Sequence, residues 1–317
     1  MGDLRRISHI YGLDDELMKD TAIEVRSLKK SYGAVPAVNG ISFSVRKGQL
    51  AALLGPNGAG KSTVINILST ITDHDDGDVF IEGMDTKTRS KRVREIIGVV
   101  FQKGVLDERL TVAENFRVRA DFYGLRGREA ACRIEEIAHM TGTRDLRDRY
   151  YGQLSGGQKR RCDIARALIH SPRILLMDEP TAGLDPDIRN AIWETIDKIR
   201  VRTGMTIIMT THYLEEAALA DNIIVMNKGK IVYDGSPGDM KCRFSKDMLV
   251  LYSSHKARRI SLLDTVDALK ILENEKGRYE SFEVIKGSIE AAYMSLIGEH
   301  SRDIGGSKDG IFDFKKP

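Results

Sequence analysis

Short apolar runs alternate with longer amphipathic stretches along most of this chain. Residues 50–54 (LAALL) and 173–177 (RILLM) carry nearly continuous apolar runs, which are typical of strands buried on both faces. Residues 23–26 and 41–45 instead alternate between apolar and polar side chains, as strands with one solvated face do. Because helical patterns separate the strands in the middle of the chain, the sequence predicts a doubly wound, largely parallel sheet.

Two predicted helices interrupt that alternation. Residues 111–123 and 128–140 are amphipathic, and Thr111 begins the first helix as an N-cap with Glu114 as its capping-box partner. We therefore expect a helical insert in an otherwise α/β chain. The other elements expected here are strands at residues 77–83, 96–101, 205–210, 223–226 and 230–233, the last two as a hairpin, and helices at 64–68, 160–169 and 186–200.

The two ends of the chain differ from its middle. Residues 1–20 are mixed and charged, and they predict a short packing arm of unassigned role. Beyond Pro237 we expect strands at residues 248–252 and 282–285, helices at 262–275 and 288–297, and a loose tail from Ser301. The predicted parts are thus the arm (residues 1–20), a main domain (21–237, with a helical subdomain at about 103–160) and a small C-terminal α/β appendix with its tail (238–317).

Composition limits the classes of protein to which the chain can belong. Its 317 residues suffice for about two domains, and the net charge of +3 results from 49 basic and 46 acidic residues. No polybasic tract dominates, which argues against a nucleic-acid partner. Cys132, Cys162 and Cys242 are far apart and predict free thiols in a reducing cytosol. Because no stretch approaches the roughly 18 apolar residues of a membrane span, we expect a cytoplasmic protein.

The strongest chemical motif follows the strand at residues 50–54. It fits the phosphate-binding pattern G-x-x-x-x-G-K-[ST], and its members are Gly55, Pro56, Asn57, Gly58, Ala59, Gly60, Lys61, Ser62 and Thr63. Glycines let the backbone wrap around a polyphosphate, which the loop amides and the positive end of the next helix attract. We expect Lys61 at the β- and γ-phosphates and Ser62 at Mg²⁺. The alternative is a glycine-rich surface turn, which the strand–loop–helix context disfavours.

Polar residues also follow other predicted strands, namely Gln102, Asp178 with Glu179, and His212. Ligands of such sheets bind at the carboxyl ends of the strands, so we expect these residues near the phosphate loop. Asp178 would face Mg²⁺, Glu179 would deprotonate an attacking water, and His212 would hydrogen-bond the γ-phosphate, while Gln102 would bind the water or the metal. Taken singly, each has a structural alternative: a turn-capping aspartate, a surface glutamine or a hydrogen-bonded structural histidine.

Two further stretches fit a nucleotide site. Tyr32 offers a flat ring for stacking on a base, although a half-buried turn aromatic is the alternative. The string LSGGQ at residues 154–158 places an N-cap serine and a bare backbone at the positive end of a helix, which suits an anion. Because the chain already has one phosphate loop, this second anion site suggests that it serves the nucleotide of another subunit.

This set of motifs resembles the nucleotide-binding subunits of ATP-binding-cassette (ABC) transporters over residues 21–237, in the family's order and with no motif missing. Residues 55–63 match the family's phosphate loop, residues 154–158 match its signature, and residues 174–179 match its second nucleotide motif, which is followed by a loop matched by residues 182–185. Three single residues also match: Gln102 corresponds to the glutamine loop, His212 to the switch histidine and Tyr32 to the adenine-stacking aromatic. The resemblance implies a P-loop NTPase core with a mostly parallel sheet, an antiparallel β subdomain and a helical subdomain.

The resemblance also implies a mechanism. Two such domains, as a homodimer, would clamp two ATP molecules head to tail, with Ser155, Gly157 and Gln158 of one domain closing on the γ-phosphate bound by the other. Hydrolysis would reopen the clamp. The implied catalytic residues are Glu179 as base, His212, Gln102 and Lys61; Ser62, Gln102 and Asp178 would hold Mg²⁺, and Asp185 would couple the two sites.

Residues 104–115 would line the groove that takes a helix of a permease, and with residues 288–294 they resemble exporter ATPases of the drug, antibiotic-resistance and nodulation type. We therefore predict an ATPase that powers transport, with export favoured, through a separate permease on the cytoplasmic face of the cell membrane. The alternatives are a soluble non-transport ABC ATPase acting on a macromolecular assembly and an ATP sensor without useful turnover. The single cassette argues against the first, and Glu179 with His212 against the second. The transported substrate is left open.

Overall fold

The computed structural model of the chain describes residues 20–253, 256–262 and 266–304, so residues 1–19 of the predicted arm and the tail after Ile304 lie outside the described residues. The chain forms two compact units, Met1–Asp234 and Gly235–Pro317, and each is described by itself.

A six-stranded sheet forms the centre of the first unit. Its strand order is β10 (Lys230–Gly235), β9 (Asn222–Asn227), β3 (Leu50–Leu54), β8 (Thr206–Thr211), β7 (Ile174–Asp178) and β6 (Ile97–Val100). Within this sheet, the strands β9, β3, β8, β7 and β6 run parallel to one another. Every residue of β3, β7 and β8 is buried, which for β3 and β7 confirms the prediction from their apolar runs.

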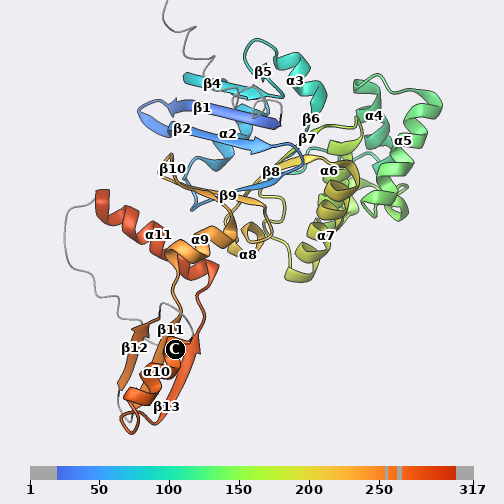
Figure 1. Cartoon of the computed structure of the whole chain (residues 1–317). Coiled ribbons are helices and arrows are strands. Elements are labelled where there is room, and N and C mark those ends of the chain that lie inside the picture. Colours follow the sequence, from blue (N-terminus) through green and yellow to red (C-terminus); the bar gives the residue numbers. More distant parts are fainter. Residues whose placement is uncertain (1–19, 254–255, 263–265, 305–317) are drawn as a thin grey trace, which may run out of the picture. The chain divides into compact units, whose positions relative to one another are not determined.

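A second, antiparallel sheet lies on one side of the first (Figure 1). It has the order β2 (Val35–Arg46), β1 (Thr21–Tyr32), β4 (Asp76–Ile81) and β5 (Met84–Asp85). Helix α2 (Lys61–Leu68) buries Val64, Ile65, Ile67 and Leu68 in one hydrophobic core with side chains of both sheets. The helix begins at Lys61, three residues earlier than predicted, because the phosphate loop leads directly into its first turn.

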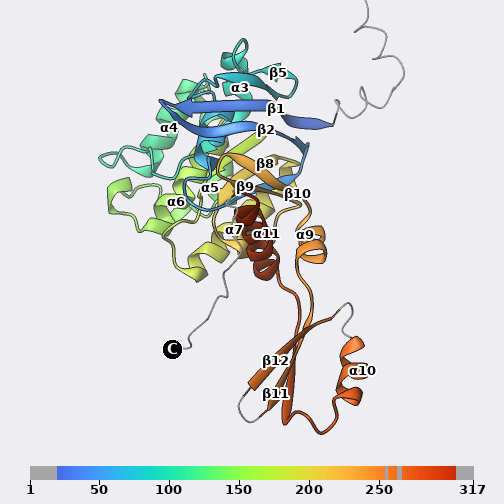
Figure 2. The same ribbon diagram turned by 90° about the vertical axis from the view of Figure 1, so that its left-hand side faces the viewer.

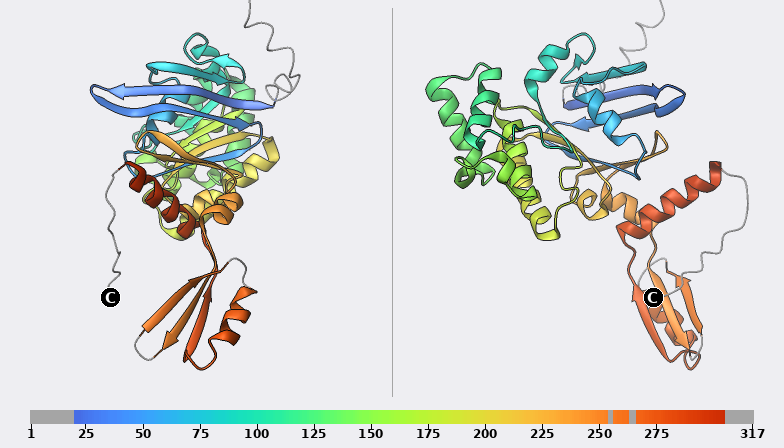
Figure 3. Two further views of the ribbon diagram at one scale, coloured as in Figure 1. Left: turned by 60° about the vertical axis from the view of Figure 1, so that its left-hand side comes forward. Right: turned by 180° about the vertical axis from the view of Figure 1, so that it is seen from behind.

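The predicted helical insert is present. It comprises α4 (Val112–Phe122), α5 (Gly127–Met140) and the short helices η1 (Arg144–Leu146) and η2 (Tyr151–Gln153), and it leads into α6 (Gly156–Leu168). Thr111 and Glu114 form the predicted capping box. Figure 3 shows α4 and α5, in green, on the side of the unit opposite the antiparallel sheet.

Three further helices lie in the described part of the first unit: α3 (Ser90–Ile96), α7 (Pro186–Thr203) and α8 (Leu214–Ala217). The sequence did not predict α3, because Val93 is its only buried residue and the helix therefore shows no helical repeat of apolar positions. Helix α7 extends three residues beyond its predicted end and stops at Gly204, which adopts the left-handed conformation with φ 66°.

The second unit contains a three-stranded antiparallel sheet with the order β12 (Lys256–Ser261), β11 (Met248–Ser253) and β13 (Ser281–Ile285). Helix α10 (Asp267–Asn274) packs on one face of it (Figure 2), through a cluster that includes Leu249, Leu251 and Ala268. Helices α9 (Pro237–Phe244) and α11 (Ile289–Ile304) pack against each other.

The predicted α/β fold class is thus confirmed, with four corrections in the second unit. Helix α10 begins at Asp267 rather than at residue 262, and neither β12 nor α9 was predicted because their sequences are mostly polar. Residues 301–304 continue α11 instead of starting a loose tail.

The three cysteines are free, with Cys132 and Cys242 exposed. Within the described ranges, no helix combines the length and apolar character that crossing a bilayer requires.

Candidate functional site

The phosphate-binding loop connects β3 to α2 in the predicted strand–loop–helix arrangement. Gly60 occupies the N-cap of α2 with φ 102°, a conformation that L side chains rarely adopt. A Cβ at this position would also lie 2.3 Å from the carbonyl oxygen of Ala37, so only glycine fits here. The following helix directs its unpaired N–H groups toward the loop, which suits a phosphate.

Lys61 lies folded back over this loop. Its Nζ donates hydrogen bonds to the carbonyl oxygens of Gly55 (2.8 Å) and Pro56 (3.1 Å), and the residue is only 5% exposed. Burial lowers the pKa of Lys61, while the nearby carboxylates of Glu179 and Asp178 act in the opposite direction. A buried cation between an anion-binding loop and two carboxylates can exchange its carbonyl contacts for phosphate oxygens.

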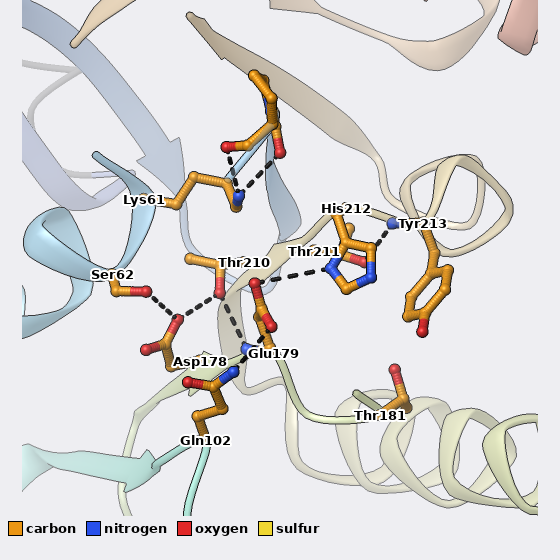
Figure 4. A network of polar contacts seen from close by, with 12 residues as sticks. Lys61, Ser62, Gln102, Asp178, Glu179, Thr181, Thr210, Thr211, His212 and Tyr213 are labelled. Atoms are coloured by element: carbon orange, nitrogen blue, oxygen red, sulfur yellow. Dashed lines mark hydrogen bonds and ion pairs between the residues drawn. The ribbon is translucent and has the colours of Figure 1, made fainter. Parts of the chain in front are cut away.

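Ser62 and Asp178 form the next part of the site (Figure 4). The hydroxyl of Ser62 donates to Oδ1 of Asp178 at 3.0 Å, which joins the first turn of α2 to the end of β7. Thr210, near the end of β8, donates to the same carboxylate oxygen at 2.6 Å and accepts a hydrogen bond from the backbone N–H of Glu179 at 2.9 Å. The hydroxyl of Thr210 therefore fixes both acidic residues.

Glu179 is the centre of a second set of contacts. Nε2 of Gln102 donates to its Oε2 at 3.1 Å, and Nδ1 of His212 lies 3.6 Å from its Oε1. The backbone of Glu179 has φ 45°, a left-handed conformation that costs a non-glycine residue of the order of 1–3 kcal/mol. The hydrogen bonds to its N–H and its carbonyl group hold it in this state.

The oxygen atoms of this cluster fit a hard divalent cation. Ser62 Oγ and Asp178 Oδ1 are neighbours in the same hydrogen bond, and Mg²⁺ prefers such hydroxyl and carboxylate ligands. The amide nitrogen of Gln102 is bound to Glu179, which leaves its amide oxygen for a metal or a water. Within the described ranges, no group of three or more His, Cys, Asp or Glu side chains is arranged for a metal.

The signature turn, residues 154–158, lies at the start of α6. Ser155 and Gln158 form a capping box with hydrogen bonds of 3.1 and 3.4 Å, so their side chains stabilise the helix end itself. A Cβ at Gly157 would lie 2.5 Å from Cγ2 of Ile188 in α7. Among the described residues, no hydrogen bond connects Ser155, Gly157 or Gln158 to the phosphate loop of their own chain.

Two other predicted residues lie apart from the network. Tyr32 ends β1 with 51% of its surface exposed, and Nζ of Lys30 is 5.7 Å from its ring centroid. Asp185 is the exposed N-cap of α7, where its side chain makes no capping hydrogen bond.

Several residues that hold the site together were not predicted from the sequence. Thr210 is one, and its position at the end of an apolar strand was the available signal. Glu216 is another: it is 2% exposed, accepts from Thr211 at 2.6 Å and is hydrogen-bonded to Thr181. Arg160 is a third, and its guanidinium bonds the backbone of two site segments. The available signal was that this charged residue stands among the otherwise mostly apolar positions that α6 buries.

Comparisons with known proteins agree with this geometry. The family model "ABC transporter" matches residues 38–182. The Nod factor export ATP-binding protein I of Rhizobium sp. (strain N33) is 43% identical over 221 residues, which cover 69% of this chain and 72% of that protein. The linearmycin resistance ATP-binding protein LnrL of Bacillus subtilis (strain 168) is 39% identical over 72% of this chain and 73% of its own. The daunorubicin resistance ATP-binding protein DrrA2 of Streptomyces coeruleorubidus is 35% identical over 83% and 82%.

Solved structures give the same result. The cbiO1 subunit of the Clostridium perfringens ABC transporter complex cbiONQ superposes with a TM-score of 0.66 at 31% identity, covering 71% of this chain and 92% of that one. An ATP-binding cassette solved as a dimer in a post-hydrolysis state, bound to ADP and Pi, gives a TM-score of 0.62 at 28% identity, covering 68% and 98%.

Proposed function

Since the chain belongs to the ABC transporter family, as one of its ATP-binding ATPase subunits, we propose that it powers export through a separate membrane-spanning permease. The support for export is that relatives which it matches over most of their length are named for Nod factor export and for resistance to linearmycin and daunorubicin. These names give no support to a non-transport ABC ATPase.

The observation that carries the enzymatic part of the proposal is the continuous network from Ser62 through Asp178 and Thr210 to Glu179 and its neighbours Gln102 and His212. It joins the ends of three strands, β6, β7 and β8, to the first turn of α2 beside the phosphate loop. In the proposed mechanism the loop amides and Lys61 hold the β- and γ-phosphates of ATP, and Tyr32 stacks on the adenine.

Glu179 is the proposed base. Its carboxylate would take a proton from the attacking water, which Gln102 and His212 would orient. Ser62, Asp178 and Gln102 would hold Mg²⁺, which would neutralise negative charge on the phosphates of ATP. The signature residues Ser155, Gly157 and Gln158 would close on the nucleotide of a second copy of the chain, with Asp185 between the two sites.

A membrane pull-down tests the transport assignment. The Glu179→Gln variant, which should hold ATP without hydrolysing it, is incubated with Mg-ATP and solubilised native membranes, and the bound proteins are identified by mass spectrometry. The proposal expects a protein with several membrane spans in the eluate, and its loss when Lys61→Ala is added to weaken ATP binding. Recovery of ribosomal or other soluble assemblies without such a protein would favour a non-transport ATPase instead.

A further inference from the structure

Arg160 joins the signature helix to the catalytic end of the site. It lies in the first turns of α6, two residues after Gln158, and is only 6% exposed. Its Nη1 donates to the carbonyl oxygen of Phe101 at 2.6 Å, and its Nη2 donates to those of Gln102 (3.1 Å) and Glu179 (3.2 Å). One side chain thus bonds the backbone of both residues whose side chains meet at the proposed water site.

The same helix holds the segment after Phe101 by further contacts. Asp163, one turn along α6, accepts a hydrogen bond from the hydroxyl of Tyr151 at 3.1 Å. A Cβ at Gly104 would lie 2.3 Å from the hydroxyl oxygen of Tyr151 and 3.2 Å from Oδ2 of Asp163, so this segment is packed tightly against η2 and α6. The segment cannot shift without α6, and α6 cannot shift without the segment.

The chemistry of the guanidinium explains why an arginine stands here. Burial lowers the pKa of Arg160, while Asp163, Tyr151 and Asp178 favour its charged form. Its planar fork offers five donors in fixed directions, whereas a lysine ammonium is a compact charge on a flexible stem. A lysine at this position would keep the charge but could not hold three carbonyl groups of two segments in one plane. Buried carbonyl groups that lose their donor are destabilised.

We propose that Arg160 is a positioning residue that couples the signature turn to Gln102 and Glu179 of the same chain. Movement of the first turns of α6, when the signature turn closes on the partner's nucleotide, is passed through the guanidinium to the backbone that carries the base and the glutamine. This inference rests on the proposed function. It adds a connection between the two ATP sites of a dimer through a residue that contacts neither nucleotide.

The first test separates positioning from binding. Arg160→Lys should lower kcat for Mg-ATP hydrolysis at least tenfold and leave KM within threefold, because the phosphate loop and Tyr32 are not among its contacts. The matched control is Arg161→Gln, which loses the neighbouring charge and its 3.0 Å bond to the Gly142 carbonyl group but no contact in the site. The control should stay within twofold of the parent. A kcat of Arg160→Lys within twofold of the parent, or an equal loss in both variants, would refute the proposal.

The second test asks which site Arg160 serves. Mixed dimers of full-length chains are prepared in which one protomer carries Glu179→Gln and cannot hydrolyse ATP at the site that contains this residue. A single turnover then measures hydrolysis only at the site that contains the intact Glu179 of the other protomer. Arg160→Lys in the protomer with intact Glu179 should slow that turnover at least tenfold. Arg160→Lys in the Glu179→Gln protomer, whose signature turn completes the active site, should change it less than threefold. The opposite pattern would mean that Arg160 merely shapes the signature turn, and would overturn the proposal.

Failure of the proposed ATPase activity, the part of the proposed function on which this inference rests, has a different result. In that case the unmodified chain would show neither Mg-ATP hydrolysis nor ATP-dependent dimers, before any Arg160 variant is compared.

Discussion

The imidazole Nδ1 of His212 lies 3.6 Å from Oε1 of Glu179, across the gap between the ends of β8 and β7. Gln102 bonds the other oxygen of the same carboxylate from the end of β6. Three strand ends thus converge on one carboxylate, which is 13% exposed at its side chain. A carboxylate held in this way from two sides is suited to orient and deprotonate a water molecule.

The first prediction concerns this carboxylate. Glu179→Gln should lower kcat for ATP hydrolysis by about 100-fold or more, since general-base catalysis commonly contributes 10²–10⁴. ATP binding should persist because the phosphate loop and Asp178 are unchanged. Steady-state hydrolysis and size-exclusion chromatography with light scattering measure the two effects, and the variant should elute as a dimer in Mg-ATP. A variant that turns over ATP like the parent would remove Glu179 from the role of base.

The second prediction concerns Thr210, which donates to Asp178 and accepts from the backbone of Glu179. Thr210→Val removes this hydroxyl at nearly constant volume. The Mg²⁺ concentration for half-maximal hydrolysis should rise by about 10–100-fold, as is usual when a partner of a metal ligand is lost.

Thr206→Val provides the matched control. It makes the same change at the other end of β8, where the hydroxyl accepts a 3.0 Å bond from the Gly48 N–H. The control should leave the Mg²⁺ titration unchanged. An equal shift in both variants would mean that the strand as a whole, rather than the Thr210 hydroxyl, sets the metal affinity.

Thr210 also shows where sequence reasoning reaches its limit. Asp178, Glu179, Gln102 and His212 could be placed at one sheet edge, because each follows an apolar run and parallel strands end on the same side. Which hydroxyl reaches which carboxylate depends on strand order. β8 lies between β3 and β7 although the chain visits them in another order, and this crossover leaves no mark in a single sequence.

The same contrast holds for the fold. Strands β3 and β7 are buried at every position and were therefore recognisable from their continuous apolar runs. Helix α3 and strand β12 were not, because tertiary contacts rather than an apolar period define them. Arg160 was missed for a related reason: its partners are backbone carbonyl groups, which any sequence contains.

The third prediction concerns the packing of Gly157 on Ile188. A methyl group at position 157 would lie 2.5 Å from Cγ2 of Ile188, which belongs to a stiff β-branched side chain. Gly157→Ala should lower the free energy of unfolding by about 1–3 kcal/mol, the usual cost of overpacking. It should also weaken ATP-dependent dimerisation, since the signature turn is displaced.

A double-mutant cycle checks the cause. Ile188→Ala added to Gly157→Ala opens the space and should recover part of the loss, measured by urea unfolding and by light scattering in Mg-ATP. Strictly additive effects of the two substitutions would show that this contact does not limit the turn.

The last prediction is a pH dependence that arises at His170. Its ring stacks on Tyr123 with centroids 3.8 Å apart, and its Nε2 lies 2.9 Å from the carbonyl oxygen of Ile97. Burial, together with the nearby guanidinium groups of Arg119, Arg166 and Arg133, lowers the pKa of His170 to about 4 against the opposing effect of the bond to Ile97. In the unfolded chain the ordinary value is near 6.5. Between pH 6.5 and 4 the unfolded state therefore binds more protons, and the folded state loses stability as the pH falls.

From pH 7 to 5 this loss should amount to about 1–2 kcal/mol after allowance for partial exposure. The glutamine of His170→Gln cannot take up the proton. From pH 7 to 5, the free energy of unfolding of this variant should therefore fall about 1–2 kcal/mol less than that of the parent, whatever the stability of the variant at pH 7. His139→Gln, at an exposed position of α5, should retain the pH dependence of the parent. Urea unfolding of the three proteins at pH 7, 6 and 5 measures the slopes. Equal slopes for the parent and His170→Gln would show that His170 is not held neutral by the fold.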